Sequence, residues 1–253
     1  ELMKVASNNL PGLGRQLRQL LLDCTNFGLV PFSIMARYAF VSMSMLKGLR
    51  AVKAIDADLY EQFLSAIPTV SGQFTTDMKL FSNGDLSLED MVMRYGHLRP
   101  HSYDITSSNY AERPDFYFQS TSTTSRSEEK HQGKSAVDLL MSRKDDIENA
   151  LAHIGLKIDA ELLSQFIVDT ITGRENFKFE FMKSVNLILE IISKIGKLIN
   201  LEQDVLSFVP VEEFIKLEAN STSQVLQSHI RRVSGQNEKQ WMLSKSIRIP
   251  DLI

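Results

Sequence analysis

Two histidines, one arginine, one aspartate and two tyrosines lie within a single eleven-residue stretch of the sequence, from Tyr95 to Ile105. The stretch has neither a helical nor a strand period, so we predict an irregular segment. Arg99 offers a planar fork of donors to an anion, His97 offers an imidazole, and Asp104 can orient a histidine ring by accepting its N–H. The alternative is a connector whose polar groups satisfy a buried turn.

A second polar cluster, Thr172-Gly173-Arg174-Glu175, precedes a long segment with a regular apolar pattern. Inside a helical bundle, an adjacent arginine and glutamate are either an ion pair between helices or part of a ligand pocket. Composition favours the ion pair, since pairs of this kind occur widely in soluble proteins without any ligand.

The sequence contains none of the common catalytic signatures. It has no Gly-rich phosphate loop followed by Lys-Ser/Thr, no Rossmann glycine pattern and no Gly-x-Ser-x-Gly elbow. One cysteine and five scattered histidines do not supply a zinc ligand set. Cys24 lies on the apolar face of a predicted helix, which favours a buried structural thiol over a nucleophile. We therefore predict no catalytic residue, no metal site and no cofactor in this chain.

Composition bounds the class of protein. The chain has 253 residues with 28 Lys plus Arg and 31 Asp plus Glu, a net charge of −3, and 43% of its residues are apolar. This is enough for a sizeable core, and the missing basic excess argues against a nucleic-acid partner. A single cysteine cannot form an internal disulfide, so a reducing, cytoplasmic location is expected. The chain begins at Glu1 and ends in an apolar run at Ile253, so we expect a segment of a longer protein.

One apolar stretch is about long enough to span a bilayer. Residues 29–46 contain a single charge, Arg37. Pro31 and several serines are unfavourable in a bilayer core. We therefore predict a buried helix within a soluble bundle and no membrane partner.

Helical signals dominate the chain. Leucines at helical spacing predict a helix over 12–24. We interpret the pair Phe27-Gly28 as the end of this helix, and we place Pro31 in the first turn of the next one. Further helices are predicted over 56–67 and 70–81, separated by Pro68, and over 88–95, capped by Ser87. A short hairpin is the one strand considered, near residues 116–118.

The second half begins after a polar loop. Residues 119–134 contain no apolar side chain, so a mobile loop is expected there. Beyond it, Asp159 is predicted to cap a long helix, and residues 181–199 carry the apolar seam of a helix packed along its length. Ser221 with Gln224 forms a predicted capping box. The prediction is an all-α, multi-helix bundle of two lobes, 1–118 and 135–253, joined by 119–134.

Several of these elements together resemble a known family. The irregular stretch is similar to the Tyr-Gly-His-x-x-Pro, Tyr-Asp-Ile element of phosphoenolpyruvate-synthase-like dikinases, and the order of the elements resembles that of rifampin-phosphotransferase-type proteins. The residues that carry the resemblance are Arg94 to Pro100, Tyr103-Asp104-Ile105, Tyr110 and Pro114, then Arg174-Glu175, Lys178-Phe179, Leu201 to Phe208 and Glu212-Glu213-Phe214, with Asn9-Leu10-Pro11, Gly28, Pro31-Phe32 and Ala36-Arg37 near the start.

The resemblance implies a place in a larger enzyme. In such proteins an ATP-grasp domain comes first, a swivelling phosphohistidine domain comes last, and a helical region lies between them; in the rifampin enzymes that region binds the phosphoryl acceptor. The chain would be this helical acceptor-binding or linker module, with both domains as partners in the same polypeptide and an unidentified small-molecule acceptor. ATP and Mg²⁺ would be cofactors of the full-length protein.

The resemblance also implies candidate residues for the acceptor. These are His97, Arg99, Tyr103 and Asp104, with Arg174 and Glu175 from the second lobe. The family's phosphohistidine motif is not in the sequence, so His97 and His101 are not expected to carry phosphoryl, and the segment alone is expected to be inactive. His101-Ser102 stand where the subfamily has Gly-Thr. Two other functions stay open: a purely structural scaffold between domains, and a free-standing helical interaction module.

Overall fold

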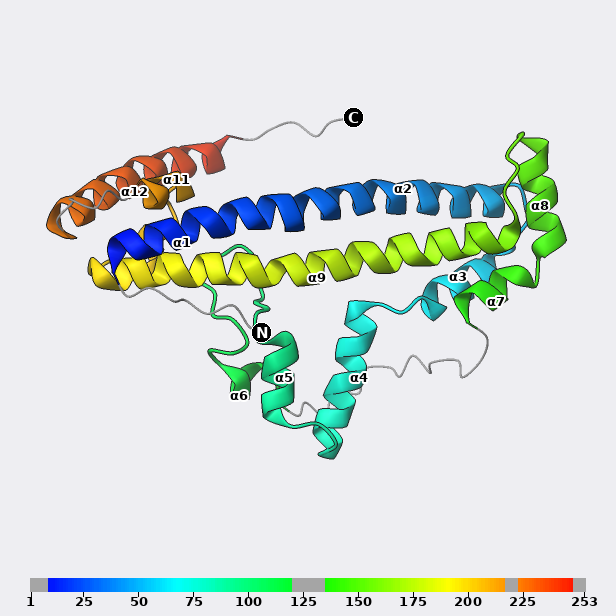
Figure 1. The fold of residues 1–253 in the computed structure, drawn as a ribbon, viewed down its shortest axis with the longest axis horizontal. Coiled ribbons are helices and arrows are strands. Elements are labelled where there is room, and N and C mark those ends of the chain that lie inside the picture. The colour runs from blue at the N-terminus through cyan, green and yellow to red at the C-terminus, as the bar shows by residue number, and fades with distance from the viewer. Residues whose placement is uncertain (1–8, 120–134, 217–222, 248–253) are drawn as a thin grey trace. The chain divides into compact units, whose positions relative to one another are not determined.

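A computed structural model describes residues 9–119, 135–216 and 223–247. Every regular element in these three ranges is helical, which confirms the all-α class (Figure 1). The predicted hairpin near 116–118 is wrong, because residues 114–117 form the short helix α6 (Pro114–Tyr117). Apart from Gln119, the predicted polar loop lies outside the described residues, as does Ser221 of the predicted capping box.

The chain divides into two compact units that differ from the predicted lobes. Unit 1 combines 1–26, 92–117 and 182–253, and unit 2 combines 27–91 and 118–181. Each unit thus draws on both halves of the sequence. The physical reason is that the apolar faces of the N-terminal helices are buried against helices from the second half of the chain, as two separate cores.

Unit 2 is built around two antiparallel helices, α2 (Val30–Ala51) and the first part of α9 (Ala160–Leu198), which lie side by side (Figure 1). The hydroxyls of Ser42 and Thr170 share a buried 2.6 Å hydrogen bond between them. The unit also contains α3 (Ala57–Ala66), α4 (Val70–Asn83), the first turn of α5 (Leu88–Tyr95), α7 (Ala136–Met141) and α8 (Lys144–His153).

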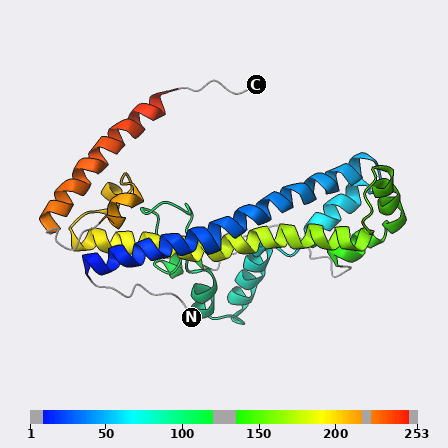
Figure 2. The same cartoon turned by 45° about the horizontal axis from the view of Figure 1, so that its top comes forward.

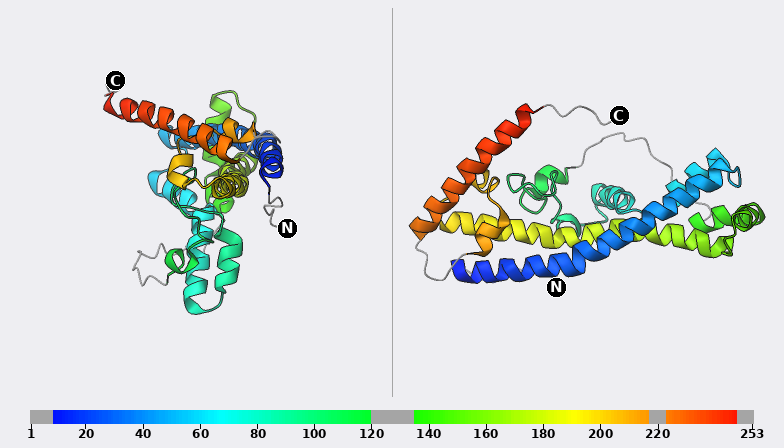
Figure 3. Two further views of the ribbon diagram at one scale, coloured as in Figure 1. Left: turned by 90° about the vertical axis from the view of Figure 1, so that its left-hand side faces the viewer. Right: turned by 90° about the horizontal axis from the view of Figure 1, so that it is seen from above.

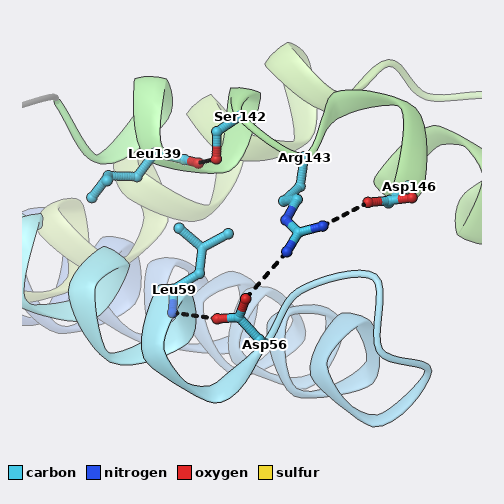
Figure 4. Close-up of polar contacts among 6 residues, drawn as sticks. All are labelled: Asp56, Leu59, Leu139, Ser142, Arg143 and Asp146. Carbon is cyan, nitrogen blue, oxygen red and sulfur yellow. Dashed lines mark hydrogen bonds and ion pairs between the residues drawn. The ribbon is translucent and has the colours of Figure 1, made fainter.

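A polar clasp joins α3 to the turn between α7 and α8 in unit 2 (Figure 4). Arg143 donates to Asp56 and to Asp146, each at 3.3 Å. Asp56 also caps α3, because its other oxygen accepts from the Leu59 amide at 2.8 Å. These charges are about half exposed, so the clasp orients the helices more than it stabilises them.

Unit 1 packs α1 (Leu10–Asp23) against the C-terminal part of α9 (Figure 3). Its core contains Leu13, Leu17 and Leu20 from α1, Ile199 directly after α9, and four isoleucines from α9: Ile188, Ile191, Ile192 and Ile195. The short helices α10 (Gln203–Leu206) and α11 (Val211–Ile215) follow. In Figure 2 they lie beside α12 (Ser223–Ser246), whose Asn237 donates to the Phe208 carbonyl at 2.8 Å.

The helix stop expected at Phe27-Gly28 is wrong. Helices α1 and α2 are continuous through a π-helical turn, η1 (Cys24–Leu29). Gly28 serves a close approach instead: a Cβ at this position would lie 2.7 Å from the Cβ of Phe181. The glycine therefore lets two helices meet, and it does not end one.

Helix α9 is longer than the sequence pattern suggested. It runs for 39 residues, and Asp159 caps it as predicted by accepting from the Leu162 amide at 2.7 Å. Thr172 to Glu175, which we placed before the seam helix, lie inside it.

One helix among the described residues is long and apolar enough to cross a bilayer, Leu10–Ala51, with a mean hydropathy of 1.4 over its most apolar window. Only 17% of that window is buried, so the expectation of a buried core helix is wrong. Its buried residues include Leu13, Leu17 and Leu20 in the unit 1 core and Leu46 and Leu49 in the unit 2 core.

Candidate functional site

The irregular stretch is held in unit 1 by its own backbone. The Tyr110 amide donates to the Leu98 carbonyl at 2.8 Å, and the Ala111 amide donates to Gly96 at 3.0 Å. Gly96 is required here, since a Cβ would lie 2.4 Å from the Val92 carbonyl oxygen. The segment 96–111 is thereby closed into a loop that begins at the end of α5.

Arg99 is the centre of this loop. The residue is buried, with 8% of its surface exposed. Its Nη1 donates to the carbonyls of Ser107 at 2.8 Å and Asp104 at 3.3 Å, and its Nη2 donates to Oδ1 of Asn186 on α9 at 2.6 Å. Both ends of the guanidinium fork are therefore occupied by groups of the protein itself.

Three further side chains complete the network. Asn109 donates to Oδ1 of Asn186 at 3.1 Å and to Glu190 at 3.2 Å, and Asn186 donates to the same Glu190 oxygen at 2.8 Å. Asn109 and Glu112 cap one another, each accepting from the other's amide. The network ties the loop to α9 at two side chains, Asn186 and Glu190, which lie about one helical turn apart. We call these residues, Arg99, Asn109, Asn186 and Glu190, the Arg99 node.

The electrostatics of the node suit a buried cation. Burial lowers the pKa of Arg99, while the carboxylates of Glu112, Glu190 and Asp104 act in the opposite direction. Arginine stays protonated under such conditions, so its charge is fixed and compensated within the node. Its Nε is buried and has no hydrogen-bond partner among the described residues.

Asp104 does not hold a histidine in the way we expected. Its Oδ1 accepts from the amide and the hydroxyl of Thr106 at 2.9 and 2.7 Å, which forms a local turn. The Thr106 hydroxyl contributes most to lowering the pKa of Asp104. His97 is half-buried, whereas His101 and Tyr103 are exposed, Tyr103 to 66%.

Arg174 and Glu175 belong to unit 2, whereas the loop belongs to unit 1. The predicted ion pair between them and another helix is replaced by two other contacts. The Arg174 guanidinium lies 6.0 Å from the Phe40 ring centroid, and Glu175 accepts from the Val70 amide at 3.1 Å. Glu175 thus caps the start of α4, which is a structural role.

Other features of the described residues offer less chemistry. No group of three or more His, Cys, Asp or Glu side chains in those ranges could hold a metal ion. An open cavity of about 350 Å³ in unit 2 is lined by Glu148, Ala152 and residues 155–159. Glu148 is already used there, because it accepts from the Ala160 amide at the start of α9.

Sequence reasoning found Arg99 but missed its partners Asn109, Asn186 and Glu190. A signal for two of them was present, since Asn186 and Glu190 are spaced by one helical turn and lie beside the apolar seam of 181–199. Polar residues at the edge of such a seam need a hydrogen-bonding partner when the helix is packed. The identity of that partner depends on the loop, which is far away in the sequence.

Comparison of the chain with known protein families, with curated proteins and with solved structures found no match. Its function is therefore inferred from its own residues and their geometry.

Proposed function

We propose that this chain is the helical linker module of a phosphoenolpyruvate-synthase-like phosphotransferase of the cytoplasm. The whole enzyme would move phosphoryl from ATP to its own histidine and then to a small-molecule acceptor. Within it, the loop around Arg99 is a structural joint that fixes the segment after α5 onto α9. Support comes from the order and spacing of the resembling motifs and from the geometry of the Arg99 node.

The observation that carries the structural role is the occupancy of the Arg99 fork. A guanidinium that grips an anionic acceptor needs two parallel donors free to face it. Here Nη1 and Nη2 donate to Ser107 and Asn186, and the residue is almost wholly buried. Binding an acceptor at this fork would break the bonds that hold the loop, at a cost of about 1–3 kcal/mol for each buried group left unpaired.

Variants of the loop test the structural role against acceptor binding. In the phosphotransferase that contains this module, Arg99→Lys should lower the melting temperature by several degrees and leave turnover per folded molecule unchanged. His97→Asn is the matched variant, because His97 is a half-buried residue of the same loop. Reduced acceptor turnover at an unchanged melting temperature, for either variant, would show that the loop contacts the acceptor.

The phosphotransferase assignment needs its own experiment. The native polypeptide, isolated with an antibody against this chain, should take up acid-labile label from labelled ATP and Mg²⁺ on a histidine outside residues 1–253. The isolated chain should stay unlabelled, because it has neither a phosphate-cradling loop nor the phosphohistidine motif. Stable label on any histidine of this chain would overturn the module assignment.

Acceptor contact at the outer face of the same loop is the second candidate. His101 is exposed and Tyr103 is 66% exposed, so their side chains are available to a ligand without disturbing the node. The paired variant His101→Ala/Tyr103→Ala should lower turnover and spare stability if this face binds the acceptor. Under the linker proposal the same pair leaves both quantities unchanged.

A further inference from the structure

The turn that joins α4 to α5 contains the one Asn-Gly pair of the sequence, Asn83-Gly84 (Figure 1). Helix α4 ends at Asn83, and α5 begins at Leu88. An asparagine followed by glycine can react with its own backbone, because a residue without a side chain leaves its amide nitrogen open to close approach by the neighbouring side-chain amide. The proposed function makes no use of this turn.

Gly84 closes the end of α4 in the left-handed region of backbone space, at φ 83° and ψ 6°. Its amide donates to the carbonyls of Leu80 and Phe81, and the Asp85 amide donates to the Leu80 carbonyl at 2.9 Å. A Cβ at Gly84 would meet nothing within 4 Å. Among the described residues, the Gly84 nitrogen is therefore held by the last turn of its own helix.

The last turn of α4 has little to keep it closed. Residues 82–85 are all exposed, so no burial stabilises the turn at these positions. Terminal helical turns of this kind open at a small cost in free energy. Opening frees the Gly84 amide and lets ψ of Asn83 rotate away from its helical value, which brings the Gly84 nitrogen within reach of Cγ of Asn83.

Other asparagines of the described ranges are restrained more strongly. Asn109 and Asn186 are buried in the Arg99 node, and the Asn237 side chain donates to the Phe208 carbonyl. Asn149 is exposed, as Asn83 is, but it lies in the middle of α8 and is followed by alanine. It is therefore a control within the same chain, because its backbone is fixed by helical bonds on both sides.

We propose that Asn83 is a site of spontaneous covalent modification, at which asparagine is converted into aspartate and isoaspartate. The Gly84 nitrogen gives its proton to hydroxide and attacks Cγ of Asn83; the N–Cγ bond forms, the Cγ–Nδ2 bond breaks, and the side-chain nitrogen leaves as ammonia. Water then opens the cyclic imide. Cleavage of the N–Cγ bond gives aspartate, and cleavage at the main-chain carbonyl gives isoaspartate, whose backbone runs through Cβ and Cγ. Water is the sole co-reactant consumed, and nothing is oxidised or reduced.

Either product changes the end of α4. A new carboxylate stands directly before Gly84 and close in sequence to Asp85. The C-terminal end of a helix carries a partial negative charge, so an added anion weakens the last turn. Isoaspartate also adds a carbon atom to the backbone of the turn. The modification therefore loosens the end of α4 as the protein ages.

Mass spectrometry of the full chain, incubated in its folded state at pH 8 and then cleaved with trypsin, tests the proposal. Cleavage after Lys79 and Arg94 releases a peptide with Asn83, and a separate peptide contains Asn149. We expect conversion at Asn83 to be at least fivefold faster than at Asn149, and slower at pH 6, where less hydroxide is present. An isoaspartyl methyltransferase should methylate the Asn83 peptide after incubation. Equal conversion at the two asparagines, or none at Asn83 in the folded chain, would overturn the proposal.

Two variants at the same position complete the test. Asn83→Gln should abolish the modification of this peptide, because the longer side chain would have to close a larger ring, and circular dichroism checks that the variant is folded. Asn83→Asp has the charge of the aspartate product and should melt at a lower temperature than Asn83→Gln. Modification of the peptide that persists in Asn83→Gln would place the reaction at another residue and overturn the proposal.

Discussion

The Nη2 of Arg99 donates to Oδ1 of Asn186 at 2.6 Å, and this bond joins two residues that are 87 positions apart in the chain. Since Asn186 also donates to Glu190, the side chain of one asparagine connects a buried cation to a carboxylate. The loop after α5 is anchored to α9 through this pair.

Replacing Arg99 by lysine should therefore destabilise the chain. A single ammonium cannot reach the Ser107 carbonyl, the Asp104 carbonyl and Asn186 together, so at least one buried acceptor loses its donor. We expect a loss of about 2–3 kcal/mol in the free energy of unfolding, measured in urea. The conservative control Arg231→Lys, at an exposed position on α12, should change it by less than about 0.5 kcal/mol. Equal effects of the two variants would show that the node contributes nothing to stability.

Two glycines on one continuous helix should respond to alanine in opposite directions. Gly28→Ala places a Cβ 2.7 Å from the Cβ of Phe181, an atom fixed to its own backbone, so a net loss of about 1–3 kcal/mol is expected. Gly48→Ala meets nothing within 4 Å and lies in the helix interior, so it should stabilise by about 0.5–1 kcal/mol. Thermal unfolding measures both. Stabilisation by Gly28→Ala would mean that the helices do not approach as closely as described.

The Glu213 carboxylate should stabilise the folded chain at neutral pH, and this stabilisation should be lost in acid. Arg232 donates to Nδ1 of His229, so Nε2 of that ring carries the proton and donates to Glu213 at 2.6 Å. This bond, followed by the one from Lys216, lowers the pKa of Glu213 from its ordinary 4.5. Because the folded pKa lies below the unfolded one, the contribution is full above the unfolded pKa and is lost as pH falls through the folded pKa.

Urea unfolding between pH 3 and pH 7 measures this component. Glu213→Gln should be less stable than the wild type at neutral pH, and the difference should shrink as the pH falls below about 4.5. The exposed neighbour variant Glu212→Gln should run parallel to the wild type. A Glu213→Gln difference that is constant with pH would contradict the role of the carboxylate charge.

The thiol of Cys24 should be a weak nucleophile in the folded chain. Partial burial raises its pKa above the ordinary 9.0, so little thiolate forms near neutral pH. Alkylation by iodoacetamide at pH 7.5 should be slower in the native chain than in the same chain unfolded in urea. Faster reaction of the native thiol would indicate an activated cysteine.

Local signals in the sequence were sufficient for much of the fold. Pro68 separates α3 from α4, Ser87 accepts from the Asp90 amide at the start of α5, and Asp159 caps α9, all as predicted. Each of these residues acts on a backbone within a few positions of itself, so the neighbouring sequence contains the needed information. The capping box at Ser135, with Asp138 as its acidic member, is equally local, although the sequence analysis placed only the start of the second lobe there.

The same reasoning could not predict contacts between residues that are distant in the sequence. Gly28 looked like a helix stop because glycine has a low helix propensity, but its role depends on Phe181, about 150 positions later. Arg99 looked like a ligand contact because a fork of donors suits an anion, and only the position of Asn186 shows what the fork holds. For the candidate site, the sequence therefore predicted the central residue and its loop, and could not supply the partners that decide its role.

The interleaving of the two units has a consequence for the order in which the chain folds during synthesis. All segments of unit 2 have been made once residue 181 has left the ribosome, whereas unit 1 lacks most of its core until later. Leu13, Leu17 and Leu20 must wait for isoleucines 188 to 199, a delay of roughly 10–30 s at about 5–20 residues per second. During that interval the leucine face of α1 is exposed, so a nascent-chain chaperone is expected to engage α1 rather than α12.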